Sequence, residues 1–204
     1  MLGKTTVDWK HERREEARRR ILDAAWVLAE RDGIGGLSLR GVARQVGLRP
    51  ASLYSYFESK HAIYDAMFAQ AYEEFATQGR QWTRQIRSRR EVIAVGFRGM
   101  LTFVQQSQAR YQLMFQRPIP DFQPSPAAYK HSEDAWQEMT GSMTAHGLDD
   151  PTLQGLVVCL GAGIAAQQMS NDPGGSHWVD LIDPATDMVL AYIQQLDTAR
   201  EETT

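Results

Sequence analysis

The pattern of apolar and polar positions is clearest over residues 38–60, where it predicts two short helices joined by a tight turn. In the first helix, Leu39, Val42 and Val46 recur at helical spacing and form one apolar face. The serine that opens the stretch stands at the N-cap, where its hydroxyl accepts a bond from an otherwise unpaired backbone N–H. Gly47 follows the last helical residue, a position that favours glycine because the chain turns left-handed there.

The second helix begins at Pro50, whose missing N–H costs nothing at a first helical position. Leu53 and Phe57 lie four residues apart and form its buried side, while serine and tyrosine side chains point outward. Helix, glycine turn and short helix together predict a helix-turn-helix, with an ordinary helical hairpin as the alternative. A helix over residues 11–31 completes a three-helix bundle. The predicted core of this bundle is Ile21, Ala25, Leu28, Leu39, Val42, Val46, Leu53 and Phe57.

The outward face of the second helix has the chemistry of a DNA contact. Hydroxyl groups donate to phosphate oxygens, and tyrosine rings pack on sugars and thymine methyls. The predicted DNA-contacting residues are Ser38, Arg40, Arg49, Ser52, Tyr54, Ser55, Tyr56 and Lys60. The arginines between residues 13 and 20 either touch the DNA backbone or pair with neighbouring glutamates, and local pairing is favoured.

The rest of the chain predicts helices and no strand, so the fold class is all-α. The expected helices cover residues 60 to about 79, 92–106, 109–115, 126–146, 151–169 and 184–196. Ser88 and Glu91 form a capping box before the second of these, and Asp183 is expected to cap the last. Residues 1–10 are expected to form a loose arm, and the tail from Arg200 to fray.

Charge and composition narrow the class of protein. Residues 1–60 hold 12 Lys+Arg and 8 Asp+Glu, whereas residues 61–204 hold 10 Lys+Arg and 17 Asp+Glu. Although the net charge of the chain is −3, its N-terminal part, which we call the head, is therefore basic. Such a head suits phosphate contact at one end only. No stretch approaches a membrane span and no apolar signal region follows the first charges, which favours a soluble, cytoplasmic protein.

No catalytic or metal site is predicted. The single cysteine, Cys159, excludes an internal disulfide and a cysteine-based zinc site, and its apolar surroundings indicate a buried, inert thiol. The five histidines lack metal-ligand spacing, and no glycine-rich phosphate loop follows a strand. An enzyme is therefore the weaker class, and no cofactor is expected.

Residues 53–60, LYSYFESK, preceded by RGVARQVGLRPAS and a basic helix, resemble the DNA-binding domain of the TetR family of bacterial one-component repressors. The family pattern has Leu, Tyr and Phe where Leu53, Tyr54 and Phe57 stand, and the resemblance covers roughly residues 15–75. The run ARYQLMF at 109–115 resembles a segment of one branch of the family's C-terminal domains. That branch often carries Trp and His-Gly in its penultimate long helix, where this chain has Val158, Ala162 and Gly163.

The resemblance implies a homodimeric regulator with a DNA-binding domain over residues 11–60 and a ligand-binding and dimerisation domain over residues 61–204. The expected partners are a double-stranded, pseudo-palindromic operator and a small, largely apolar effector. The predicted effector pocket is lined by Phe97, Met100, Phe103, Met114, Trp136, Met139 and Met143, although residues of these types are more often plain core.

Two helices are candidates for the dimer seam, Pro151–Met169, which is thin and apolar, and Pro184–Leu196. The predicted seam residues are Leu160, Gly161, Ile164, Ala165, Met188 and Tyr192. The alternative is that the first of these helices is thin because it packs against its own chain. A second function also stays open, a helical small-molecule-binding or interaction protein without specific DNA binding.

Overall fold

In a computed structural model that describes residues 5–202, the described part of the chain is helical and contains no strand. The α-helices are α1 (Thr5–Asp32), α2 (Leu39–Gln45), α3 (Pro50–Leu53), α4 (Lys60–Trp82), α5 (Arg89–Gln106), α6 (Gln108–Phe115), α7 (Pro126–Ala145), α8 (Pro151–Asn171) and α9 (Ile182–Glu202). Three 3-10 turns connect them, namely η1 (Ile34–Gly36), η2 (Thr83–Gln85) and η3 (Val179–Leu181). The all-α class is confirmed.

By internal contacts the chain divides into two units. Of the described residues, the first unit holds 5–71 and 109–131, and the second holds 72–108 and 132–202. This division follows packing, so it does not test the functional boundary expected at residue 60, which stays a prediction.

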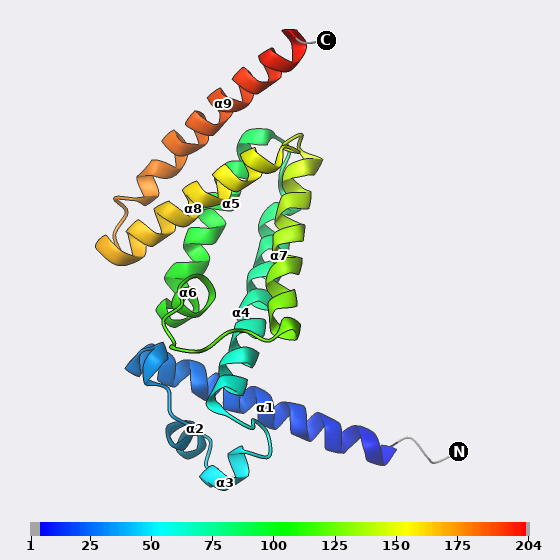
Figure 1. Ribbon diagram of the computed structural model, residues 1–204, viewed down its shortest axis with the longest axis vertical. Coiled ribbons are helices and arrows are strands. Elements are labelled where there is room, and N and C mark those ends of the chain that lie inside the picture. Colours follow the sequence, from blue (N-terminus) through cyan, green and yellow to red (C-terminus); the bar gives the residue numbers. More distant parts are fainter. Residues whose placement is uncertain (1–4, 203–204) are drawn as a thin grey trace. The chain divides into compact units, whose positions relative to one another are not determined.

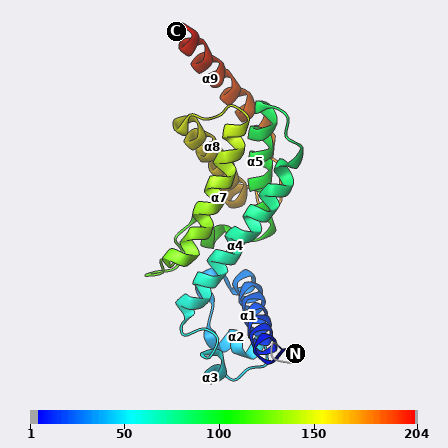
Figure 2. The same cartoon turned by 90° about the vertical axis from the view of Figure 1, so that its right-hand side faces the viewer.

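In the first unit, α2 and α3 lie close together beside α1 (Figures 1 and 2). Six of the eight predicted core residues are buried, whereas Leu39 and Val46 are only half-buried. Ile34 and Leu37 complete this core. They follow the glycine-rich turn, where no helical period marks them as apolar-facing.

The segment after α5 also belongs to the first unit. The Glu30 carboxylate accepts a bond from the Ala109 backbone N–H, and the Arg110 guanidinium lies over the Trp26 ring. Asp65 of α4 accepts bonds from the backbone N–H and the hydroxyl of Ser125, at 2.6 and 2.8 Å. That hydroxyl in turn accepts from the Ala128 N–H and caps α7.

In the second unit, α8 and α9 both pack against α5 (Figure 1). Eight residues of α5 are buried, which agrees with its nearly all-apolar sequence. At the N-terminus of α5, the Ser88 hydroxyl accepts from the Glu91 N–H, which is half of the predicted capping box. The Glu91 carboxylate accepts from the Arg87 N–H rather than from that of Ser88, so the reciprocal half is displaced by one residue.

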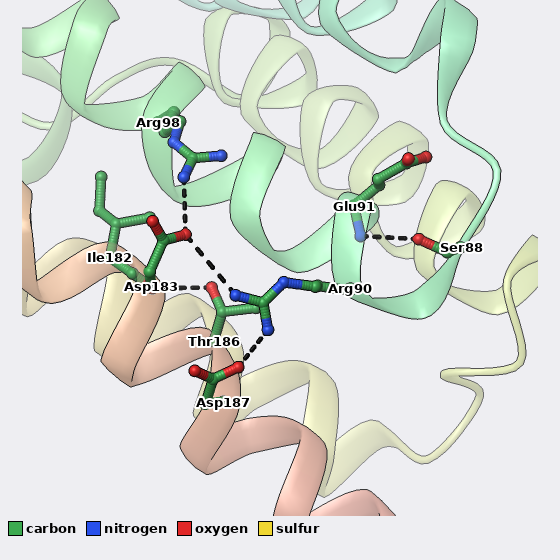
Figure 3. A network of polar contacts seen from close by, with 8 residues as sticks. All are labelled: Ser88, Arg90, Glu91, Arg98, Ile182, Asp183, Thr186 and Asp187. Atoms are coloured by element: carbon green, nitrogen blue, oxygen red, sulfur yellow. Dashed lines mark hydrogen bonds and ion pairs between the residues drawn. The ribbon is translucent and has the colours of Figure 1, made fainter.

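Ion pairs connect α5 to α9 at the surface (Figure 3). Arg90 is paired with Asp183 and Asp187, and Arg98 donates to Asp183 at 2.7 Å. Exposed pairs of this kind contribute little stability, about 0–1 kcal/mol each. They do correct one expectation, because Asp183 lies in the first turn of a helix that begins at Ile182 and serves as an arginine partner, not as the cap.

Four further expectations are wrong. Residues 5–10 belong to α1 rather than to a loose arm, while residues 1–4 lie outside the described part. Helix α9 continues to Glu202 instead of fraying from Arg200, while residues 203–204 lie outside the described part. Cys159 is exposed, because it lies on the side of α8 that its own chain leaves uncovered. Finally, the expectation that no stretch approaches a membrane span is wrong, because α8 is long and apolar enough by length and composition. Core helices of soluble proteins pass the same test.

Candidate nucleic-acid interface

Helix α2 begins and ends as its sequence predicts. The Ser38 hydroxyl accepts a bond from the Gly41 N–H at 3.1 Å. At the other end Gly47 has a φ of 72°. The Leu48 N–H donates to the Ala43 carbonyl at 2.8 Å, and the Gly47 N–H donates to the Arg44 carbonyl at 3.2 Å. These two bonds form a Schellman motif, which sets the angle at which the chain leaves α2.

Helix α3 is a single turn anchored on two apolar side chains. Pro50 occupies its first turn, as expected, and Arg49 precedes it without a side-chain cap. Leu53 is 1% exposed and Phe57 is 2% exposed. The predicted helix does not continue regularly to Phe57, since residues 54–56 form a turn. Two buried anchors therefore orient the polar side chains between and before them.

The outward side chains lie largely where the sequence placed them. Ser52 and Ser55 are exposed and Tyr54 is 53% exposed, whereas Tyr56 is half-buried. The cations Arg40 and Arg49 are exposed. Two hydroxyls already have an internal role, because that of Ser38 caps α2 and that of Ser55 donates to the Ser52 carbonyl at 2.7 Å. A DNA contact by any of these residues stays a prediction.

Two arginines of α1 hold the end of this segment. Arg14 donates to the Ser55 carbonyl at 2.7 Å, and Arg18 donates to the Tyr56 carbonyl at 2.5 Å. The Arg18 guanidinium also lies over the Phe57 ring, with 4.2 Å between Cζ and the ring centroid. Cations are favourable at a helix C-terminus, where carbonyl groups lack partners. We call this arrangement the Arg14–Arg18 clamp.

The clamp corrects the expectation of local pairing. Of the arginines between residues 13 and 20, Arg19 pairs with Glu16, whereas Arg14 and Arg18 bind carbonyls about forty residues away in sequence. Their four-residue spacing puts them on one helix face, but no sequence signal identifies backbone carbonyls as partners.

Lys60 and Tyr64 tie α4 to the 3-10 turn before α2. Lys60 Nζ lies 3.2 Å from the Gly35 carbonyl, and the Tyr64 hydroxyl donates to the Ile34 carbonyl at 2.6 Å. Burial raises the pKa of Tyr64 to about 12. Lys60 therefore has a structural partner in addition to the phosphate contact that the sequence predicted for it.

Residues 21–67 match the sequence model described as "Bacterial regulatory proteins, tetR family". The matched segment starts in α1, contains η1, α2 and α3, and ends in the first half of α4. It thus includes both helices of the motif and the glycine turn between them. The chain therefore carries a DNA-binding domain of the TetR family. It is a DNA-binding transcriptional regulator, and the matching family is one of regulators rather than enzymes.

Solved proteins share the fold of most of this chain. FadR from Bacillus subtilis, solved in complex with stearoyl-CoA, is 13% identical with a TM-score of 0.65, over 84% of this chain and 96% of FadR. The multidrug binding protein EbrR, complexed with imidazole, is 21% identical with a TM-score of 0.61, over 84% and 93%. PfmR from Thermus thermophilus is 19% identical with a TM-score of 0.58, over 84% and 97%. No curated protein matches the chain by sequence.

The predicted effector-pocket residues differ in burial. Phe97, Phe103 and Met143 are buried in the second unit, where Met100 and Met139 are half-buried. Phe103 meets the Phe75 ring edge-on, with 5.0 Å between centroids, so part of its surface belongs to plain core.

The other two behave differently. Trp136 is 45% exposed on α7, and Met114 is buried within the first unit. The pocket as a set stays a prediction.

The predicted seam residues of α8 face two ways. Gly161 is buried, and a Cβ there would lie 2.9 Å from the Phe97 ring of α5. Ala165 and Ile164 are also buried by their own chain, and Leu160 is half-buried. The alternative reading, that α8 is thin in order to pack on its own chain, therefore explains Gly161.

The opposite side of α8 carries exposed apolar groups that are not among the predicted seam residues. Leu156 is 46% exposed, and Cys159, Ala162 and Gly163 are exposed beside it. On α9, Met188 and Tyr192 are 57% and 38% exposed, which agrees with their predicted role as seam residues without testing it. Among the described residues no group of His, Cys, Asp and Glu side chains is placed to hold a metal ion.

Proposed function

We propose that this protein is a cytoplasmic repressor that binds a pseudo-palindromic operator as a homodimer and is released by a small, largely apolar effector. The observation that carries the proposal is the outward face of the helix-turn-helix, where an exposed tyrosine, serines and arginines are held on two buried anchors. A recognition helix of this kind enters the major groove with its N-terminal residues toward the bases.

On this proposal the face has two kinds of contact. Arg40 and Arg49 neutralise phosphates, while Ser52 and Tyr54 reach the bases, sugars and thymine methyls. Ser38, Ser55, Tyr56 and Lys60 complete the set predicted from the sequence. The functional DNA-binding domain then covers residues 11–60, and residues 61–204 bind the effector and the second protomer.

The effector proposal rests on composition and on the relatives of this fold. FadR was solved with stearoyl-CoA, whose acyl chain is apolar, and EbrR is a multidrug binding protein. Apolar pockets with few polar anchors suit such molecules. On this proposal the dimer has two arrangements, which differ in the separation of its DNA-binding domains. The effector changes operator binding only as far as its affinities for these two arrangements differ.

The dimer proposal rests on the uncovered side of α8 and α9. Two heads must be held about one helical turn of DNA apart, roughly 34–36 Å, so a contact outside the heads is required. Leu156, Met188 and Tyr192 are large apolar side chains that one chain leaves exposed. We place the seam on them and on the small residues Ala162 and Gly163, which allow close approach of backbones.

The proposed DNA face is tested by Tyr54→Ala and Arg49→Gln in the full-length protein. Tyr129→Ala is the matched control, because Tyr129 is also 53% exposed but lies on α7. The probe is a set of fluorescein-labelled duplexes from the region upstream of the protein's own gene, and the readout is anisotropy over a range of KCl concentrations. We expect both head variants to bind more weakly, and Arg49→Gln to lower the salt slope by about one.

If both head variants bind like the control at every salt concentration, the face is misplaced. If the wild-type protein binds none of these duplexes better than a random duplex, the helical small-molecule-binding or interaction protein becomes the better reading. Turnover of a small molecule by the purified protein would show that it is an enzyme.

A further inference from the structure

The first turns of α1 carry an exposed tryptophan beside two cations. Trp9 is 42% exposed. The Lys10 ammonium lies 5.9 Å and the Arg13 guanidinium 5.4 Å from the centroid of its ring. Neither cation has a carboxylate partner among the residues that the structure describes. We call Trp9, Lys10 and Arg13 the aromatic–basic cluster.

The side of α1 that carries the cluster also holds acidic residues. By helical spacing, Arg20 lies on the same side as Trp9 and Arg13, and Glu12 and Glu16 lie on or beside that side. Glu16 pairs with Arg19, and neither glutamate is paired with Lys10 or Arg13. Both cations of the cluster therefore keep their charge for another partner.

The cluster is attached to the recognition segment through the clamp. Arg14 follows Lys10 by one helical turn and donates to the Ser55 carbonyl. From Arg14 to Trp9 the helix advances about 7.5 Å, at 1.5 Å per residue. The clamped end of the recognition segment is its C-terminal end, which lies at the mouth of the groove when the N-terminal end meets the bases. A surface that extends from this end approaches the sugar–phosphate backbone.

We propose that the aromatic–basic cluster is a second DNA-binding site of the head, which grips the phosphate backbone of the operator next to the base pairs reached by α3. Lys10 and Arg13 neutralise phosphates, and Trp9 holds both cations while its exposed face packs on deoxyribose. The occupant is DNA because the cluster is continuous with the helix-turn-helix and complementary to DNA in charge. This proposal rests on the proposed function.

The test compares Lys10→Gln/Arg13→Gln with Arg19→Gln, which removes the same kind of charge from an ion-paired position of the same helix. The probes are duplexes selected by the full-length protein from a randomised 40-bp library, and the same duplexes shortened at both ends. Affinity is measured by anisotropy at several KCl concentrations, and contacts are mapped by hydroxyl-radical footprinting. Circular dichroism melts check that each variant is folded.

We expect the double variant to lower the salt slope by about 0.9 for each phosphate that is no longer neutralised, which raises Kd about eightfold per phosphate at 100 mM salt. Its footprint should shrink at the flanks and stay intact at the centre. Shortening the duplex should weaken the wild type and leave the double variant unchanged. Arg19→Gln should behave as wild type.

If the double variant has the wild-type salt slope and footprint while Tyr54→Ala binds more weakly, the proposal of a second site is wrong. DNA binding by the helix-turn-helix would still stand. A double variant that loses the whole footprint would also overturn the proposal, since the cluster would then support recognition rather than the flank. If neither it nor Tyr54→Ala affects binding, the proposed function itself fails.

Discussion

Tyr64 joins the second turn of α4 to the chain just before α2. Its ring is fully buried, and its hydroxyl donates to the Ile34 carbonyl at 2.6 Å. The Lys60 ammonium lies 5.3 Å from the centre of the same ring and reaches the neighbouring Gly35 carbonyl. Two side chains of α4 thus satisfy carbonyls of a turn that has no strand or long helix to supply partners. Together they set where the helix-turn-helix begins relative to α4.

The raised pKa of Tyr64 predicts a pH dependence of stability. Its pKa is about 12 in the folded protein and about 10 in the unfolded chain. Because the folded value is the higher one, the contribution is complete below about pH 10 and is lost as pH rises from about 10 to 12. Tyr64→Phe removes both the titration and a hydrogen bond that contributes about 0.5–1.5 kcal/mol.

We therefore expect the wild type to be the more stable protein at pH 8 and the difference in unfolding free energy to narrow above about pH 10. Urea denaturation of both proteins from pH 8 to 11 measures this difference. Parallel stability curves over the whole range would show that Tyr64 titrates at the same pH in the folded and the unfolded chain.

At the scale of elements, α5 is the helix against which the second unit is packed. Two close contacts depend on the absence of a side chain. A Cβ at Gly99 would lie 2.3 Å from the Trp82 ring, and a Cβ at Gly161 of α8 would lie 2.9 Å from the Phe97 ring. Aromatic rings of α4 and α5 thus approach neighbouring helices more closely than any residue larger than glycine allows.

Gly99→Ala and Gly96→Ala form a matched pair within α5. Alanine at position 99 displaces the Trp82 ring, and we expect it to destabilise the protein by about 1–3 kcal/mol. Gly96 is exposed, and no atom of a neighbouring side chain or element lies within 4 Å of a Cβ at that position. Alanine there should stabilise the protein by up to about 1 kcal/mol through helix propensity.

Chemical denaturation of the two variants and the wild type measures the change in unfolding free energy that each substitution causes. Equal stabilisation by the two substitutions would mean that Trp82 does not pack on Gly99.

At the scale of the whole molecule, the described part of one chain leaves apolar side chains uncovered on α8 and α9. Leu156 and Met188 are each about half exposed, and the thiol of Cys159 on α8 is exposed as well. Large exposed apolar patches mark interaction sites, and on the proposed function these side chains belong to one. This is why the proposed seam moves from Gly161, which its own chain covers, to the neighbouring Gly163.

Gly163→Arg tests the seam without disturbing the fold, because a Cβ at this position meets nothing within 4 Å. Across a two-fold axis the change places like charges face to face in a desolvated contact. We expect a folded monomer that no longer binds the operator. Gly141→Arg, at an exposed and equally open position of α7, should remain a dimer.

Size-exclusion chromatography with light scattering at micromolar concentration distinguishes the two variants. A Gly163→Arg protein that remains dimeric would place the interface elsewhere on the chain.

Local signals in the sequence determined the elements. Ser38, Gly47 and Pro50 act through caps and backbone conformations within a few residues, so the helix-turn-helix, its buried Leu53 and Phe57 and its outward Tyr54 could all be predicted. The family resemblance added the expected function, because its motif lies in this same short stretch.

Contacts between distant residues were decided only by the tertiary structure. The carbonyls held by Arg14 and Arg18 carry no side-chain signature, and the ring that covers Gly161 lies 64 positions earlier, at Phe97. Periodicity shows that a helix has an apolar or a thin side, but many partners satisfy the same periodicity. Which side faces its own chain, and which is left for DNA or a second protomer, depends on how the helices pack.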